Sequence, residues 1–350
     1  MENNLSRQAI FAEISHPLSF EDVMARGYAT VDLRAAGEYL SGTIPGAINI
    51  PLFDDDERGV IGTLYRHVGQ ARAVDAGFEY TERKLSHLIS CFELFRGKEF
   101  VVFCARGGMR SLAVVNLLSQ VGFKVYQLEG GYKKYRHYVL TRLNGFQPRL
   151  IVIHGLTGTG KTRIIERLDH ALDLEGLACH RSSLFGGLDR KPENQKNFEG
   201  KLVDILGSLA EEPYFIEGES RKIGKVFIPE RLAMAMKNGV LVCVHCSMET
   251  RIRRILEDYP VMNRKMRREI ELILKSLKQK MGAVLVARMC ELLQRGELEE
   301  LVHILLVQYY DKRYGKSMGN YKYHMEFSSE NIDDAVEKCR ILRRNLLHNC

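Results

Sequence analysis

Long apolar runs are absent from this 350-residue sequence, and none approaches the roughly 20 residues that a membrane-spanning helix needs. The first residues, MENNLSRQAIF, have polar residues ahead of any apolar segment and lack the apolar core of a secretion signal. Low-complexity segments and internal repeats are also lacking, which argues against a disordered chain or a solenoid. We therefore expect a globular, cytoplasmic protein that does not enter membranes.

A disulfide framework is also lacking, because the eight cysteines are scattered along a long chain without a secretion signal. This usage favours reduced thiols. The stretch CVHC at 243–246 has the Cys-x-x-Cys spacing of metal and redox sites, but no second ligand pair accompanies it. We interpret it as part of a buried strand and name no protein metal ligands.

The charge balance is moderately basic, with 51 Lys and Arg against 44 Asp and Glu and a formal net charge of +7. Such an excess suggests an anionic partner such as nucleic acid or a phosphorylated metabolite, although it is also common in proteins that bind neither. The length and a hydrophobic content of 45% fit two domains with ordinary cores.

Short apolar runs alternate with helical patterns, which predicts an α/β fold with parallel sheets. In the first half the predicted strands lie in YATVDLR (28–34), GAINIP (46–51), EFVVFC (99–104) and FKVYQLEGG (123–131). In the second half they lie in RLIVIHG (149–155), PYFIEGE (213–219) and GVLVCVHC (239–246), with a helix over KTRIIERLDHAL (161–172) and a mostly helical chain from Met248 onward. Gly145 and Pro148 interrupt the periodicity, so we predict domains over 1–145 and 146–350.

The stretch FCARGGMRS (103–111) places Cys104 at the end of an apolar strand, before a glycine-containing loop and a helix predicted to begin with Ser111 as N-cap. Converging backbone N–H groups and a helix N-terminus lower the pKa of a thiol and favour the nucleophilic thiolate. Arg106 and Arg110 add positive charge that would hold an anion or a persulfide sulfur. The alternative is a buried cysteine in an ordinary tight turn.

A second motif, HGLTGTGKT (154–162), follows a predicted strand and opens a predicted helix, which is the context of a phosphate-binding P-loop. The predicted phosphate-binding residues are Gly155, Thr157, Gly158, Thr159, Gly160, Lys161 and Thr162. The glycines let backbone N–H groups approach phosphate, Lys161 supplies charge, and Thr162 is placed to reach a metal. Glu217 or Glu219 at the end of an apolar strand is the candidate acidic partner, or else a solvated strand end.

The first half resembles a rhodanese domain. The resemblance rests on VDLRAAGEYLSGTIPGAINIPL (31–52), the Cys104 loop and LEGGYKKYR (128–136). It implies that Cys104 carries a chalcogen as a persulfide or selenide equivalent, organised by Arg110 and the loop backbone. Gly42 and Thr43 stand where the family usually has Gly-His before Ile-Pro-Gly, so Thr43 takes the place of the histidine. Asp32 and Arg34 are interpreted as a structural pair.

The second half resembles the tRNA 2-selenouridine synthase family. The matching segments are LDLEGLACHRSSLFGG (172–187), EGESRKIGKVFIP (217–229) and LLVQYYDKRY (305–314). The resemblance implies replacement of sulfur by selenium in a 5-substituted 2-thiouridine at the tRNA wobble position, through an S-geranylated intermediate. The substrates would be tRNA, geranyl diphosphate and selenophosphate, with no tightly bound cofactor, and selenophosphate synthetase would be a candidate partner. It also implies that His180 and Arg181 line the site near the phosphate loop.

The chemistry agrees with this implication, because an alkylated sulfur leaves C2 far more readily than a thiocarbonyl sulfur does. We hypothesise that the P-loop binds the diphosphate of the prenyl donor. The motif leaves open whether the loop binds geranyl diphosphate, ATP or GTP, and whether magnesium takes part. An ATP-dependent sulfurtransferase acting on tRNA or a carrier protein is the alternative enzyme, and a nucleotide-gated scaffold is the non-enzymatic one.

Two basic stretches, RIRR (251–254) and NRKMRREIELILKSLKQK (263–280), offer a surface for tRNA phosphates. The candidate tRNA-binding residues are Arg251, Arg253, Arg254, Arg264, Lys265, Arg267 and Arg268. A solvated helix face is the alternative interpretation. Tyr309, Tyr310 and Tyr314 are either a stacking site for an unpaired base or part of the core.

Overall fold

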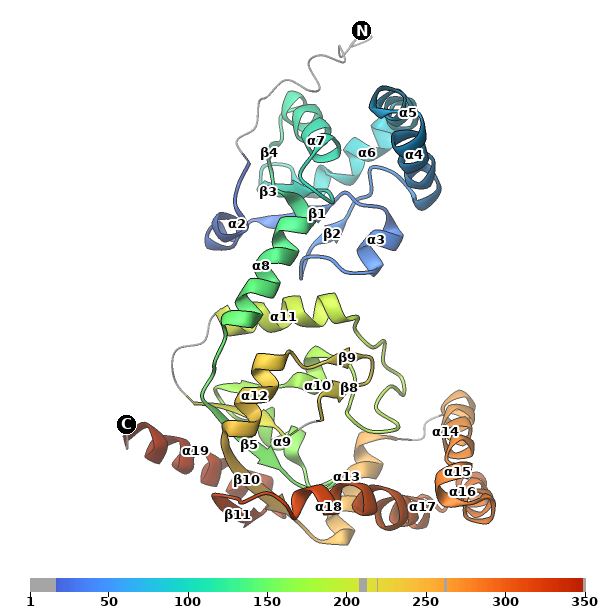
Figure 1. Ribbon diagram of the computed structural model, residues 1–350. Coiled ribbons are helices and arrows are strands. Elements are labelled where there is room, and N and C mark those ends of the chain that lie inside the picture. The colour runs from blue at the N-terminus through green and yellow to red at the C-terminus, as the bar shows by residue number, and fades with distance from the viewer. Residues whose placement is uncertain (1–16, 208–212, 219, 261–262, 349–350) are drawn as a thin grey trace. The chain divides into compact units, whose positions relative to one another are not determined.

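The computed structural model describes residues 17–207, 213–218, 220–260 and 263–348. The chain divides into two compact units, which are described separately below. The first unit comprises Met1–Arg142 together with Asn194–Val203, and the second comprises Leu143–Glu193 together with Asp204–Cys350. Both units are built on parallel sheets with helices (Figure 1).

The first unit contains a four-stranded parallel sheet in the order β2-β1-β3-β4. The strands are β1 (Ala29–Asp32), β2 (Ile48–Asn49), β3 (Glu99–Phe103) and β4 (Lys124–Gln127). The helices are α2 (Phe20–Arg26), α3 (Ala36–Leu40), α4 (Asp55–His67), α5 (Gln70–Arg83), α6 (Leu85–Cys91), the 3₁₀ turn η1 (Glu93–Phe95), α7 (Met109–Gln120) and α8 (Gly131–Gly145), whose last residues belong to the second unit. All four strands that the sequence predicts for this half are confirmed. Val31 of β1 and the apolar residues of β3 are buried, whereas Ile48 of the two-residue edge strand β2 is 42% exposed.

A buried ion pair anchors the loop after β1. Arg34 donates from Nη2 to Asp32 Oδ2 at 2.5 Å and to the carbonyl of Gly42 at 2.7 Å, and both charged side chains are buried. Thr43 donates its hydroxyl to the same Asp32 oxygen at 2.8 Å. The structural role predicted for Asp32 and Arg34 is confirmed, and Thr43 contributes to the same network.

The second unit contains a five-stranded parallel sheet in the order β11-β10-β5-β7-β6 and a short antiparallel pair, β8 with β9. The strands are β5 (Leu150–His154), β6 (Ala171–Leu172), β7 (Tyr214–Glu217), β8 (Lys222–Ile223), β9 (Val226–Phe227), β10 (Val240–His245) and β11 (Met325–Ser328). The three predicted strands are therefore confirmed. The predicted helix over 161–172 is wrong at its end, because α9 stops at Ile165 and Ala171–Leu172 pairs with β7 as an edge strand.

Most of the chain after Met248 is helical, as predicted, apart from β11. The helices of this unit are α9 (Lys161–Ile165), α10 (Leu174–Leu177), the end of α11 (Gln195–Gly207), α12 (Glu230–Asn238), α13 (Met248–Asp258), α14 (Arg264–Ser276), α15 (Lys278–Met281), α16 (Ala283–Arg295), α17 (Leu298–Leu305), the π-helix η2 (Leu306–Tyr310), α18 (Asp311–Met318) and α19 (Ile332–His348). One apolar core joins α14, α16, α17 and η2, and another packs α9 and α19 against the sheet. Across the described ranges, no helix combines the length and apolar character needed to cross a membrane.

The turn between β4 and α8 packs tightly against the loop that follows β3. Gly131 has φ +55°, a left-handed conformation that strains other residues. A Cβ at this position would overlap the carbonyl oxygen of Cys104 and the amide nitrogen of Gly107. The Gly-Gly-Tyr segment therefore packs directly against the backbone of the cysteine loop and fixes its position.

We predict that Gly131→Ala lowers the free energy of unfolding by about 3 kcal/mol or more, because backbone strain and overlap act together. Gly97→Ala is the matched control, since Gly97 also has positive φ, +77°, but within the described ranges no atom lies within 4 Å of the place that its Cβ would occupy. Strain alone should limit its loss to about 1–2 kcal/mol. Equal losses in denaturant titrations of the two variants would contradict this account of the turn.

Candidate functional sites

The cysteine loop of the first unit places a buried thiol at the start of a helix. Cys104 directly follows β3, and α7 begins at Met109 with Gly108 as its N-cap. The prediction that Ser111 is the N-cap is wrong. Ser111 instead lies within the first turn, and its hydroxyl turns inward to lie 3.2 Å from Cys104 Sγ.

Gln127 holds this serine in place from β4. Its side-chain amide donates to Ser111 Oγ at 2.8 Å and to the carbonyl of Gly107 at 3.0 Å. Because the amide donates to the Ser111 oxygen, the serine proton is directed toward its other neighbours, the thiol and the carbonyl of Gly108. Sequence reasoning missed Gln127, since a glutamine that ends a strand belongs to no motif.

Several groups act on the pKa of the Cys104 thiol. Burial raises it, but the Ser111 hydrogen bond, the charge of Arg110 and backbone N–H groups of Arg106 and Ser111 together bring the pKa below its ordinary value. The side chain of Arg106 is exposed, so this residue contributes through its backbone. Arg110 is half-buried, and its Nη1 lies 3.4 Å from Glu38 Oε2. The loop is therefore suited to a nucleophilic thiolate.

The phosphate loop of the second unit occupies the carboxyl end of β5, the middle strand of its sheet. Gly158 and Gly160 have φ +84° and +88°, and a Cβ at Gly158 would lie 2.9 Å from the carbonyl oxygen of Arg251. Lys161 begins α9 and donates from Nζ to the carbonyl of Gly155 at 2.9 Å. Thr162 Oγ1 lies 3.4 Å from Glu175 Oε2. The strand–loop–helix arrangement that the motif predicts is thus confirmed, and phosphate binding by these residues stays a prediction.

Two buried arginines of α13 hold the phosphate loop by its carbonyl groups. Arg251 donates from Nε to Thr157 O at 2.8 Å and from both Nη atoms to the carboxylate of Asp311, at 3.0 and 2.6 Å. Arg254 donates to Thr159 O at 3.0 Å and to Ser329 O at 2.6 Å. With exposed fractions of 4% and 3%, these side chains do not face solvent.

The prediction that the three arginines of RIRR contribute to an exposed basic surface is therefore wrong for Arg251 and Arg254. Both point inward to loop carbonyls, a kind of partner that linear sequence does not reveal. The other candidate residues, Arg253, Arg264, Lys265 and Arg268, are exposed, whereas Arg267 is half-buried and donates to the carbonyl of Leu293. A tRNA-binding role for these residues stays a prediction.

A cavity of about 500 Å³ begins at the phosphate loop. Its polar wall contains Lys161, Thr162, Arg163, Glu175, Arg181 and Glu217. Arg181 donates to the carbonyl of Asp258 and stacks over the ring of Tyr259, with its guanidinium carbon 4.7 Å from the ring centroid. Glu217, at the end of β7, is 1% exposed, whereas Glu219 lies outside the described residues.

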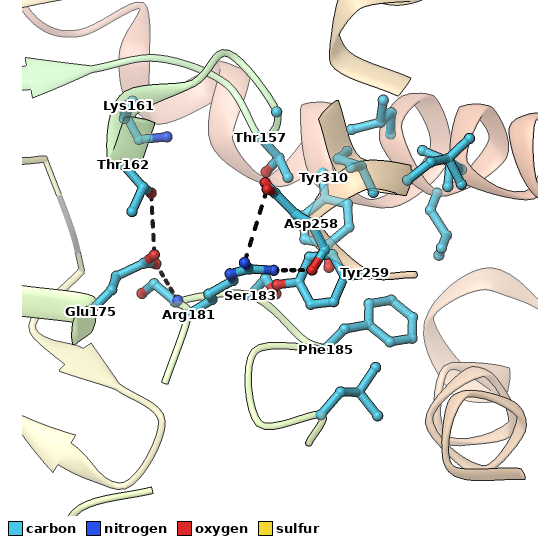
Figure 2. Close-up of a pocket in the computed structure, with 18 of the residues that line it drawn as sticks. Thr157, Lys161, Thr162, Glu175, Arg181, Ser183, Phe185, Asp258, Tyr259 and Tyr310 are labelled. Carbon is cyan, nitrogen blue, oxygen red and sulfur yellow. Dashed lines mark hydrogen bonds and ion pairs between the residues drawn. The ribbon is translucent and has the colours of Figure 1, made fainter. Parts of the chain in front are cut away.

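The opposite wall of the same cavity is apolar. It is formed by Phe185, Leu188, Ile255, Leu256, Leu298 and Leu305, together with neighbouring residues of α17 and η2. Figure 2 shows Lys161 and Thr162 on one side of the cavity, with Phe185, Tyr259 and Tyr310 across from them. One end of the cavity therefore suits an anion and the other suits a hydrocarbon chain.

The remaining predicted site residues are His180, Arg181 and the tyrosines at positions 309, 310 and 314. Arg181 lines the cavity as expected, but His180 packs against the turn at Gly224 between β8 and β9 and is not among the cavity-lining residues of the described chain. Tyr309 and Tyr310 are buried at 9% and 5% exposure and pack in the helical core, which supports the core alternative over base stacking. The side chain of Tyr314 lies outside the described residues.

The last residue of β5, His154, was not singled out from the sequence. Burial and then the nearby charge of Lys161 lower the pKa of His154 to about 4, so its imidazole is neutral at pH 7. Its ring lies 4.9 Å from the ring of Tyr321 and 5.7 Å from that of Tyr323, measured between centroids. The tyrosines lie in the segment before β11, a strand that the sequence did not predict.

Comparison with protein families agrees with the two units. A rhodanese-like domain matches residues 19–138, and the tRNA 2-selenouridine synthase AAA domain matches residues 148–341. The chain is thus a rhodanese-like domain followed by a P-loop domain. Since the second match extends over more than half of the sequence, the chain belongs to the tRNA 2-selenouridine synthase family.

Individual relatives support this assignment. The tRNA 2-selenouridine synthase of Nitrosomonas europaea is 34% identical over 241 residues, which is 65% of this chain and 63% of that protein. The Pseudomonas putida (strain W619) protein of the same name is 36% identical, over 66% of each chain. The Proteus mirabilis protein is 35% identical over 74% of this chain and 70% of its own. The chain thus matches somewhat less than two thirds of the length of the first two relatives.

Among solved structures, the N-terminal domain of a putative ATP/GTP binding protein from Clostridium difficile 630 is 43% identical. The match covers 36% of this chain and 99% of that one, with a TM-score of 0.34.

We predict that Ser111→Ala raises the pKa of Cys104, because a hydrogen bond that stabilises the thiolate is lost. The pH midpoint of Cys104 alkylation by iodoacetamide, followed by peptide mass spectrometry, should rise by about one pH unit. Ser119→Ala, at the far end of α7, should leave the midpoint unchanged. An unchanged midpoint in the Ser111 variant would show that the serine does not tune the thiol.

We also predict that Arg254→Met weakens binding of inorganic diphosphate about tenfold, because the Thr159 carbonyl loses the guanidinium donor and keeps the Ser329 hydroxyl. Arg254→Lys, which keeps the charge and some of the donors, should lose less. Arg253→Met is the control, since the neighbouring arginine side chain is 64% exposed. Calorimetric titration gives the diphosphate affinity of each variant, and thermal melting shows whether the variant is still folded. Equal affinities in the two methionine variants would refute the role assigned to Arg254.

Proposed function

We propose that this chain is a tRNA-modifying transferase that replaces sulfur by selenium in a wobble 5-substituted 2-thiouridine. The proposed route is S-geranylation with geranyl diphosphate followed by selenation with selenophosphate. Membership of the tRNA 2-selenouridine synthase family supports the overall reaction. The observation that carries the choice of donor is the cavity with a phosphate loop at one end and an apolar wall at the other.

The two walls fit the two parts of a prenyl diphosphate. Lys161 and the loop N–H groups face the place where a diphosphate would bind, and a ten-carbon chain would replace water along Phe185, Leu298 and Leu305. A volume of about 500 Å³ lies within the usual range for sites of small ligands. The ribose and base of ATP have polar edges that the apolar wall would leave without hydrogen bonds.

The first step would transfer the geranyl group to the base. The C2 sulfur of 2-thiouridine attacks C1 of geranyl diphosphate, the C1–O bond breaks, and diphosphate leaves. Lys161 and the loop N–H groups stabilise the negative charge that develops on the leaving group. The N3 proton of the base is lost as the C2–S bond becomes single, and the carboxylates of Glu175 and Glu217 in the cavity wall are candidate acceptors.

The second step would exchange the chalcogen. Water cleaves the P–Se bond of selenophosphate, which releases phosphate and a hydrogen selenide anion. The selenide adds at C2, the C2–S bond breaks, and the sulfur takes up the selenide proton and leaves as geranyl thiol. Cys104 is the proposed chalcogen-handling thiolate, which its lowered pKa supports. Arg110 would help to bind the anionic donor. Selenophosphate synthetase as a partner and a cytoplasmic location remain predictions.

The proposal is tested by nucleoside mass spectrometry on tRNA that carries 2-thiouridine, incubated with geranyl diphosphate, with or without selenophosphate. The wild-type chain should form the geranylated nucleoside and, with selenophosphate, the 2-selenouridine. Lys161→Ala should lose the first product, whereas Cys104→Ala should accumulate it and lose only the second. Selenation that needs ATP but no geranyl diphosphate, or sulfur addition instead, would favour the ATP-dependent sulfurtransferase.

The apolar wall gives a further prediction. Leu298→Ala should weaken geranyl diphosphate binding about tenfold, because a leucine contact with the tail is lost, and should leave inorganic diphosphate binding unchanged. Leu272→Ala is the control, since this leucine is 67% exposed and lies outside the cavity. A parallel loss for both ligands, measured by calorimetry, would mean that the tail does not contact this wall.

A further inference from the structure

Three aromatic rings form a cluster around His154, the residue that precedes the phosphate loop. His154, Tyr321 and Tyr323 contact one another with ring centroids 4.9, 5.7 and 6.3 Å apart. The planes cross at 50–60°, so the rings meet partly edge to face. Tyr321 is 44% exposed, whereas the other two rings are half-buried. The cluster thus offers a supported but accessible aromatic surface.

The backbone connects this cluster to the phosphate loop through His154. His154 directly precedes Gly155, the first residue of the phosphate loop, and its ring lies 2.8 Å from where a Cβ at Gly218 would be. Gly155 and Gly218 both line the cavity. His154 therefore joins the cluster to the start of the phosphate loop, while the three rings themselves are not among the described residues that line the cavity.

Positive and hydrogen-bonding groups alternate with the tyrosines. Lys322 and His324 flank Tyr323 in the sequence YKYH (321–324), and both are exposed. Aromatic faces that stack bases, combined with cations that contact phosphates, are typical of proteins that bind single-stranded RNA. The charge and the ring faces both complement an unpaired nucleotide.

We propose that Tyr321, supported by His154 and Tyr323, stacks the target base of the tRNA anticodon loop and presents it to the donor cavity. This inference rests on the proposed function and deepens it by naming the acceptor site. The wobble base is suited to such a site because it is unpaired and can be splayed out of the loop. Lys322 would contact an adjacent phosphate.

The neutral state of His154 is compatible with this role. Its pKa of about 4 means that a base stacked on the cluster meets an uncharged imidazole at pH 7. The site also accounts for base recognition without Tyr309 and Tyr310, which are only 9% and 5% exposed.

The test compares two anticodon stem-loops, one with 2-thiouridine at the wobble position and one with an abasic residue there. Fluorescence anisotropy is measured with the full chain. Wild type should bind the thiouridine RNA about tenfold more tightly than the abasic RNA. Tyr321→Ala should remove this difference by weakening only the first complex, whereas Tyr321→Phe should keep it. Tyr65→Ala, at an aromatic residue of the first unit that is 59% exposed, is the control.

Geranyl diphosphate binding is measured for each variant and should be unchanged, which shows that the fold and the donor cavity are intact. If Tyr321→Ala weakens both RNAs equally, or neither, the stacking proposal is wrong. If it weakens ATP binding but not RNA binding, the cluster holds the base of a nucleotide and the proposal is likewise wrong. If wild type binds neither stem-loop, the proposed function itself fails, and the acceptor site fails with it.

Discussion

A diphosphate and a hydrocarbon chain make opposite demands on a binding cavity, and helix α13 meets both in the second unit. A diphosphate needs N–H donors in fixed positions, while a hydrocarbon needs a wall that water does not wet. On α13, Arg251 and Arg254 fix the carbonyl groups of the phosphate loop. Ile255 and Leu256 of the same helix line the cavity. The loop and the apolar wall are thus parts of one packed arrangement.

Burying two arginines is unfavourable unless their donors are satisfied. The bidentate pair with Asp311 and the carbonyl acceptors of Thr157, Thr159 and Ser329 satisfy them. Asp311 directly follows the π-helix η2, whose Tyr310 lines the cavity. The same contact therefore links the position of the phosphate loop to that of the helical wall.

Motifs governed by local backbone geometry could be predicted from the sequence. The parallel strands, the loop around Cys104 and the phosphate loop were located correctly, because apolar runs and closely spaced glycines encode them directly. The first turn of α7 was misjudged, since the inward hydroxyl of Ser111 is set by Gln127 on another strand. Features of this kind depend on residues that meet only after folding.

The same limit explains what was missed in the second unit. The sequence suggested that Arg251 and Arg254 are surface charges, because the loop carbonyls that accept their hydrogen bonds are about 95 residues away in sequence. The apolar wall of the cavity could not be predicted from the sequence for a related reason. Leucines at helical spacing predict a buried face, but they do not reveal that part of that face borders a cavity. Short strands such as β6 and β11 carry too few residues to show a period.

The most direct measurement of the central claim is a calorimetric comparison of geranyl diphosphate, inorganic diphosphate and ATP as ligands of the full chain. The account predicts that geranyl diphosphate binds more tightly than inorganic diphosphate, with a more negative heat-capacity change because apolar surface is buried. It also predicts that geranyl diphosphate displaces ATP. Tighter binding of ATP, with the geranyl chain adding nothing to the affinity of diphosphate, would contradict the assignment of the cavity.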